Sequence, residues 1–173
     1  LIERERIISQ GTIDIAEHAL EHGCGLNVAG GTHHAYTDRG EGFCLLNDMA
    51  IAANWLLKTN RVKTRPSRAD AGAPVLIFDV DVHQGNGTAQ IFQNDPNVYT
   101  FSMHGANNYP LHKEESDRDV PLPDHTPDDV FLETLEKELD ETLDRVKPDF
   151  VFYLSGVDVL ATDKLGRLGL SLD

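Results

Sequence analysis

The fold class follows from one stretch of the sequence, VLIFDVDVH at residues 75–83. Residues 75–82 are β-branched or apolar except for two aspartates. Such a run is typical of a central parallel strand that becomes polar at its carboxyl end. Because side chains alternate along a strand, we predict that Asp79, Asp81 and His83 share one side of it.

Apolar segments on the carboxyl side predict more strands of the same sheet. Residues 98–103 and 150–157 have strand character, and the second is expected to be as buried as residues 75–82. Between them, Thr126-Pro127-Asp128-Asp129 predicts a helix start, with an N-cap, a proline at the first position and an acidic first turn. This alternation predicts a three-layer α/β/α fold with a mainly parallel sheet.

The amino-terminal part is expected to be mostly helical. A helix-spaced apolar pattern ends at Gly23, and a short strand is predicted at Leu26 to Ala29, where Gly30-Gly31 breaks it. Asn47 is a candidate N-cap for a buried helix that reaches Leu57. The polar residues 58–74 are expected to form a loop.

Composition limits the class of protein. The chain has 173 residues, of which 40% are hydrophobic and 25% charged, so we expect a single domain over residues 1–173. Because the chain starts at Leu1 inside an expected helix and stops at Asp173, we expect this domain to be partial, incomplete at both ends. The net charge of −14 argues against nucleic acid and anionic membranes as partners.

Cysteine content and hydropathy indicate the compartment. Cys24 and Cys44 form no CxxC pair and cannot make a disulfide scaffold, so a reducing cytoplasm is expected. No apolar run is long enough to span a bilayer, and nothing in the sequence indicates the oligomeric state.

A metal site is predicted where the carboxyl ends of the strands meet. Asp158 follows the apolar residues 150–154, as Asp81 and His83 end their own strand. Buried carboxylates need a cation or strong donors, and two carboxylates with one imidazole leave a coordination position open, as in catalytic zinc sites. Capping of helices or pairing with arginine is the alternative for these aspartates.

A histidine pair is predicted on the same rim. His33-His34 directly follows Gly30-Gly31 at the end of the expected strand. An isolated surface pair usually has no role, but beside a metal two imidazoles can transfer protons near neutral pH.

Four segments resemble the motifs of a known family. They are GGTHHA at 30–35, GFCLLND at 42–48, DVDVHQGNG at 79–87, and GVD at 156–158 with DKLG at 163–166. In this order they resemble the zinc-dependent histone deacetylases, whose relatives include acetoin-utilisation proteins and acetylpolyamine amidohydrolases. Residues 84–87 together with TDRG at 37–40 are most similar to the class IV branch and its bacterial kin. The resemblance implies the arginase/deacetylase fold.

The resemblance also implies roles for individual residues. Asp81, His83 and Asp158 match the zinc ligands; His33 and His34 match the tandem histidines beside the metal, and Asp79 matches the carboxylate that orients the first of them. A narrow acyl-lysine channel would have Gly42 and Phe43 as one wall and Tyr109 as the other. A structural potassium ion would be held, partly through backbone carbonyls, by Asp79, Asp81, His83, Ser102 and Met103.

The implied activity is zinc-dependent hydrolysis of an amide, which removes acetyl or another acyl group from a lysine peptide, a polyamine or a small acyl-amine. Ferrous iron is an alternative metal. His34 would be the general base. Asn86 stands where many members have an aspartate, so His34 would lack a full anionic partner and favour its neutral form, still a competent base.

One other function stays open, and a second is disfavoured by the sequence. The family's catalytic tyrosine lies in a glycine-rich loop downstream of the segment that matches Asp158 and is not among these residues, so the chain would hold only part of the catalytic set. A non-catalytic or truncated metal-binding relative is therefore an alternative. An arginase-like binuclear manganese hydrolase would need more carboxylates around Asp81, and the sequence does not supply them.

Overall fold

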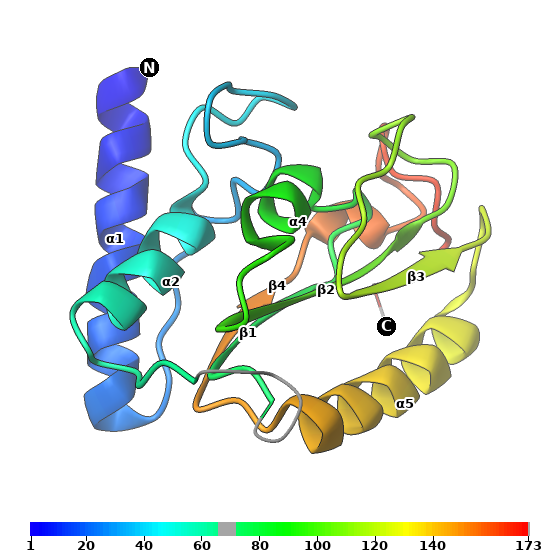
Figure 1. The fold of residues 1–173 in the computed structure, drawn as a ribbon. Coiled ribbons are helices and arrows are strands. Elements are labelled where there is room, and N and C mark those ends of the chain that lie inside the picture. Colours follow the sequence, from blue (N-terminus) through cyan, green and yellow to red (C-terminus); the bar gives the residue numbers. More distant parts are fainter. Residues whose placement is uncertain (66–71, 173) are drawn as a thin grey trace.

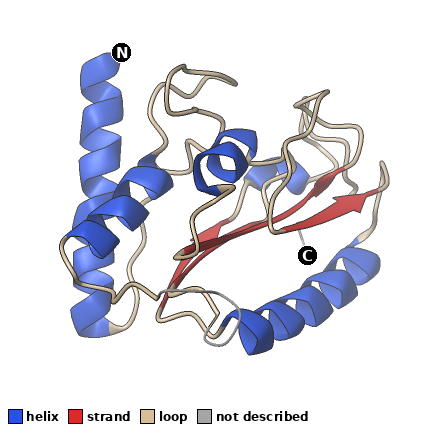
Figure 2. Cartoon of the chain, viewed as in Figure 1, coloured by secondary structure: helices blue, strands red, loops and turns tan. Residues whose placement is uncertain are grey.

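The computed structural model describes residues 1–65 and 72–172, and a four-stranded sheet lies at its centre. The strand order is β3-β2-β1-β4, and each neighbouring pair is parallel (Figure 2). The predicted parallel sheet is therefore confirmed. The strands are β1 (Val75–Asp79), β2 (Val98–Gly105), β3 (Arg118–Leu122), which the sequence did not predict, and β4 (Phe150–Leu154).

Helices cover both faces of the sheet and give the predicted three layers (Figure 1). On one face lie α1 (Ile2–His22), α2 (Asp48–Lys58) and α4 (Asn86–Phe92), and on the other lies α5 (Asp128–Val146). A hydrophobic core lies on each face of the sheet, and β1 contributes side chains to both because they alternate. Ile77 packs in the core on the α2 side, and Phe78 packs in the core on the α5 side. None of the described helices is long and apolar enough to cross a membrane.

Helix ends mostly follow the sequence signals. α1 stops at Gly23, whose φ of 90° is left-handed and whose N–H donates to Ala19 O. Asn47 caps α2 by accepting a hydrogen bond from Ala50 N at 3.0 Å. The predicted start of α5 was one residue early: the N-cap is Pro127, because the Thr126 hydroxyl donates to Pro123 O instead of capping the helix.

The predicted strand at residues 26–29 was wrong. Asn27 ties this segment to α1: its Nδ2 donates to Ile8 O at 3.2 Å and to Thr12 Oγ1 at 2.8 Å. Its Oδ1 accepts from Ala29 N at 3.1 Å and closes a turn. The segment is therefore an irregular connection, and the tandem histidines that follow lie in a loop, not at a strand end.

β1, which leads into the predicted metal ligands, is shorter than predicted and ends at Asp79. Asp79 Oδ1 accepts from Asp81 N at 3.0 Å, and Asp81 Oδ1 accepts from His83 N at 2.8 Å. Each bond reaches two residues ahead, as in an Asx turn, and so curls the backbone away from the sheet. The prediction that the three side chains alternate along one strand was therefore wrong. Asp79 ends β1, and Asp81 and His83 lie in the bend that follows.

β4 is more exposed than predicted. Val151 and Tyr153 are 42% and 60% exposed, whereas Phe152 and Leu154 are buried on the α2 side. The cause is position, since β4 lies at one edge of the four-stranded sheet and α5 packs against β1 and β2. The loop predicted at residues 58–74 falls partly on residues 66–71, which lie outside the described residues.

Candidate metal centre and its histidine pair

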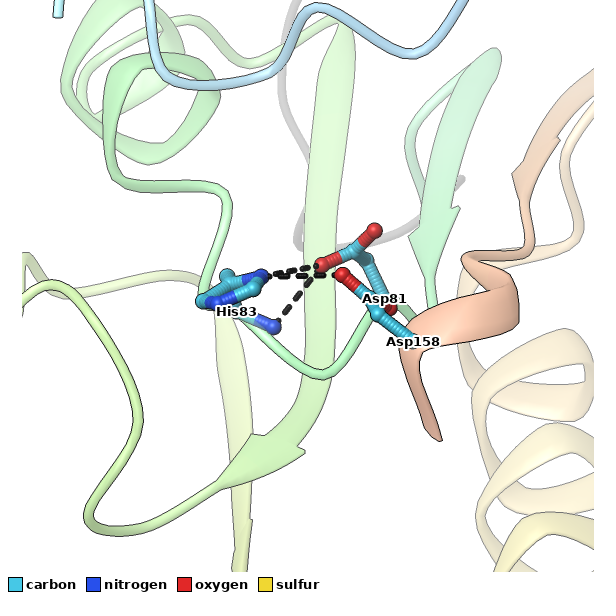
Figure 3. A group of neighbouring side chains, drawn as sticks. All are labelled: Asp81, His83 and Asp158. Atoms are coloured by element: carbon cyan, nitrogen blue, oxygen red, sulfur yellow. Dashed lines mark hydrogen bonds and ion pairs between the residues drawn. The ribbon is translucent and has the colours of Figure 1, made fainter. Parts of the chain in front are cut away.

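The three predicted metal ligands converge at the carboxyl edge of the sheet. Asp81 and His83 follow β1, and Asp158 lies in the short helix η1 (Val157–Val159) that comes after the neighbouring β4. One ligand atom from each residue lies within 4.8 Å of the others (Figure 3). His83 Nδ1 is 3.1 Å from Asp81 Oδ1 and 3.1 Å from Asp158 Oδ2.

The chemistry of this cluster suits a divalent cation. Among the described residues, only imidazoles form ion pairs with Asp81 and Asp158. Burial lowers the pKa of His83, but hydrogen bonds to Asp158 and Asp81 outweigh it and raise the value to about 9. The two carboxylates thus favour positive charge at this position. Gly156 lies against both carboxylates, and a Cβ there would collide with them.

His33 is coupled to Asp79 next to the ligands. Its Nδ1 is 2.6 Å from Asp79 Oδ2, and its Nε2 is 3.9 Å from Asp81 Oδ1. Burial lowers the pKa of His33, but the charge and hydrogen bond of Asp79 outweigh it and raise the value to about 9. Burial also disfavours the charged form of Asp79 and raises its pKa, so His33 and Asp79 together retain one proton. This contact is compatible with the predicted role of Asp79 in orienting His33, and that role stays a prediction.

His34 is in a different electrostatic environment. Its Nδ1 is 2.6 Å from Asn86 Oδ1, and its ring centroid is 4.1 Å from that of His33. Burial lowers the pKa of His34 to about 4, and the charge of His33 adds to the effect. His34 is therefore neutral where His33 is charged, so one imidazole is able to accept a proton beside another that holds one.

The residues predicted to line a channel lie around His34. Gly42 has a φ of 53° and packs so closely on the His34 ring that a Cβ would collide with it. Phe43 is 98% exposed at the tip of the same turn. The Tyr109 ring stands edge-on to His34, with 5.0 Å between the centroids, and is 38% exposed. That these residues enclose a channel stays a prediction.

The residues predicted to hold potassium lie on the adjoining strands. Ser102 is the register partner of Asp79 across β1 and β2, and Ser102 and Met103 are both buried. Both Asp79 carboxylate oxygens are engaged, one with His33 and the other with Asp81 N. The potassium ion therefore stays a prediction that would rest on backbone carbonyls.

Sequence reasoning missed two carboxylates that support the histidine pair. Asp48 is buried at the first turn of α2 and accepts hydrogen bonds from the backbone of Gly31 and Thr32. Glu41 accepts a hydrogen bond from Asn86, the partner of His34. Asp48 is the last residue of the motif at 42–48, but an acidic residue in a first helical turn is common and does not indicate this contact. Glu41 directly precedes the same motif and lies in no periodic segment.

Comparison with known proteins assigns the family. The family model described as the histone deacetylase domain matches residues 1–173. The chain belongs to the histone deacetylase family. An uncharacterised protein of Picosynechococcus sp. is 46% identical over 171 residues, which are 99% of this chain and 54% of that protein. Histone deacetylase 2 of Arabidopsis thaliana is 33% identical, over 94% of this chain and 40% of its own length.

Other family members agree in sequence and in fold. The acetoin utilization protein AcuC of Staphylococcus aureus is 33% identical over 86% of this chain and 38% of its own length. The crystal structure of a histone deacetylase homologue complexed with SAHA superposes with a TM-score of 0.81, at 26% identity, over 96% of this chain and 45% of that one. For the HD domain of HDA15 the TM-score is 0.76, at 26% identity, over 96% and 50%. The arginase/deacetylase fold is thus confirmed, and this chain spans roughly half the length of these similar proteins or less.

Proposed function

We propose that the cluster of Asp81, His83 and Asp158 binds zinc and belongs to an amide hydrolase that removes acyl groups from lysine-like amines. The observation that carries the proposal is the convergence of these three ligand atoms beside His33 and His34, whose ring centroids are 4.1 Å apart. Two carboxylates and one imidazole form a ligand set of the catalytic type, which leaves a position for substrate or water. Ferrous iron is compatible with the same ligands.

The chemistry that a divalent ion supplies in such a site is activation of water and polarisation of the substrate carbonyl. The protein residues manage the protons. His34 Nδ1 faces Asn86, so Nε2 is the nitrogen that takes a proton from the attacking water and then returns it to the leaving amine. His33, held protonated by Asp79, contributes a positive charge next to it.

The family supports the substrate class. The relatives include a protein named histone deacetylase and one named for acetoin utilization, and one structural neighbour was solved with SAHA. We propose an acylated lysine peptide, an acylated polyamine or a small acyl-amine as substrate, with no nucleic acid and no membrane as partner. A structural potassium ion and a cytoplasmic location are parts of the same proposal.

The test is hydrolysis by the longest natural form of the protein. Acetyl-lysine peptides, longer acyl-lysine peptides and acetylated polyamines are assayed with and without a chelator, followed by return of Zn²⁺ or Fe²⁺. We expect one substrate class to be cleaved, the chelator to abolish cleavage and the metal to restore it. Cleavage that survives complete metal removal would contradict the proposal. Metal binding without cleavage of any of the substrates would favour the non-catalytic alternative.

A further inference from the structure

His34 is linked to Glu41 through the side-chain amide of Asn86. Asn86 is fully buried, and its Oδ1 is 2.6 Å from His34 Nδ1. Its Nδ2 donates one hydrogen bond to Glu41 Oε1 at 2.9 Å and another to the Tyr36 hydroxyl at 3.0 Å. Both amide protons and the amide oxygen of Asn86 are therefore engaged.

The partners of this amide permit only one orientation. The pKa of Glu41 is lowered, chiefly by the hydrogen bond from Tyr109, so its carboxylate is an acceptor without a proton. The Tyr36 hydroxyl donates its proton to Glu114 Oε1 at 3.0 Å and can therefore only accept from Asn86. The reverse orientation of the amide would set its oxygen against two acceptors. Nδ2 must face Glu41, and Oδ1 must face His34.

The orientation of the amide in turn determines the tautomer of His34. An amide oxygen is an acceptor, so His34 Nδ1 has to carry the hydrogen, and the lone pair of the neutral ring is then on Nε2. Nε2 is the nitrogen that the proposed function needs as the base. A neutral partner thus fixes the tautomer of His34 without a carboxylate in contact with the ring.

The Glu41 carboxylate is itself held in place. Its Oε1 also accepts a hydrogen bond from the Tyr109 hydroxyl at 2.7 Å, and its Oε2 is 3.5 Å from Arg39 Nε. Its backbone exchanges two hydrogen bonds with Cys44, at 3.0 and 2.8 Å, across a tight turn. Glu41 therefore presents an acceptor in a fixed position to Asn86.

We propose that Glu41 is a positioning residue for His34, because it orients the Asn86 amide and thereby keeps the base in the tautomer with a free Nε2. This inference rests on the proposed hydrolase function for its effect on rate. The tautomer itself is independent of turnover and is measured separately.

The first test removes the acceptor. In Glu41→Leu, the Asn86 amide loses the partner that orients it. We expect kcat to fall roughly 10- to 100-fold, by analogy with the loss of a hydrogen-bond partner behind a metal ligand. Glu41→Gln keeps an acceptor oxygen and should retain most of the activity. Glu133→Gln, at an exposed position of α5, is the matched control.

A charge exchange distinguishes orientation from general support of the fold. Asn86→Asp sets a second carboxylate against Glu41, and we expect it to lower kcat as well. In the double variant Asn86→Asp with Glu41→Gln, the glutamine amide donates to the new carboxylate, which still accepts from His34 Nδ1. Activity should recover in the double variant to above that of Asn86→Asp alone. Additive losses would overturn the proposal.

The direct readout is the nitrogen-15 NMR spectrum of the imidazoles in labelled, zinc-loaded protein, with the His34 signal assigned through His34→Gln. We expect the Nδ1–H tautomer in the unaltered protein and a mixture of tautomers in Glu41→Leu. An unchanged tautomer in Glu41→Leu would overturn the proposal. If the tautomer changes in a protein that hydrolyses no substrate, the proposed function fails while the positioning role stands.

Discussion

Asp48 and Thr32 are joined by two hydrogen bonds, from Thr32 N at 2.8 Å and from Thr32 Oγ1 at 2.7 Å, both to Asp48 Oδ1. The other carboxylate oxygen accepts from Thr12 Oγ1 at 2.6 Å, and Gly31 N is 3.2 Å from both oxygens. A single buried carboxylate therefore ties α1 and α2 to the loop that leads into His33.

Replacing this carboxylate should destabilise the protein. Asp48→Ala leaves the buried hydroxyl of Thr12 and the half-buried donors of Thr32 without this acceptor, so we expect the free energy of unfolding to fall by roughly 3 kcal/mol. Urea unfolding measures the change. Asp14→Ala, at an exposed carboxylate of α1 that accepts a hydrogen bond from Gln10, should change the free energy of unfolding by no more than about 0.5 kcal/mol. Equal effects of the two substitutions would show that Asp48 does not organise the loop.

Loss of a proposed ligand should weaken metal binding strongly. Asp158→Asn removes one of two anionic ligands, and we expect the affinity for Zn²⁺ to fall by roughly 100-fold or more. Even the loss of a residue that only hydrogen-bonds to a metal ligand lowers metal affinity by up to about 100-fold. Titration calorimetry and the metal content after dialysis measure this. Asp140→Asn, at an exposed position of α5, is the matched control. Retained zinc in Asp158→Asn would remove that residue from the site.

Alanine substitutions at Gly23 and Gly42, which both have left-handed backbones, distinguish the effect of backbone strain from that of a side-chain collision. Gly23 has open space around its Cβ position, whereas a Cβ on Gly42 would collide with the His34 ring. Alanine at either position should cost about 1 kcal/mol in unfolding free energy from backbone strain. Only Gly42→Ala should also displace His34 and lower acyl-lysine hydrolysis about 10- to 100-fold. Similar turnover in the two variants would mean that Gly42 does not set the position of His34.

The sequence predicts the architecture well where the signals are local. The apolar residues of β1 and β2 predict two strands that the structure contains, although β1 ends earlier than predicted. The Asn47 cap and the Gly23 stop are also confirmed. The motif at residues 79–87 leads to a ligand cluster that the structure brings together with Asp158. Parallel strands that end at one edge make such a cluster predictable.

The errors arise where side chains compete with the backbone or where the sheet has an edge. Asn27 forms hydrogen bonds with α1 and so takes residues 26–29 away from the sheet. The apolar run that contains Tyr153 is typical of a central strand, but the exposure of Tyr153 depends on what packs beside β4. Glu41 reaches Asn86 only through the folded turn, so no sequence pattern predicts the contact.

Acid should destabilise the protein partly through His104, which is buried in β2 and bonded to Ser102 Oγ at 3.0 Å. Burial lowers the pKa of His104 to about 4; the charge of Lys113 lowers it too, and that of Asp119 opposes the shift. Because the unfolded chain takes up this proton near pH 6.5, the stabilising contribution of His104 is complete above pH 6.5. It is lost progressively as the pH falls towards about 4, and its full size is on the order of 3 kcal/mol.

The variant His104→Asn keeps a polar side chain but cannot take up the proton. We expect the free energy of unfolding of the unaltered protein to fall between pH 6.5 and 4 more steeply than that of the variant, by up to about 1.4 kcal/mol per pH unit. His34, with a pKa lowered to about 4, should continue to contribute a slope of the same sign in both proteins. Urea unfolding at several pH values measures the two slopes. Parallel slopes would show that His104 takes up its proton equally in the folded and unfolded states, so that its burial in β2 does not hold it neutral.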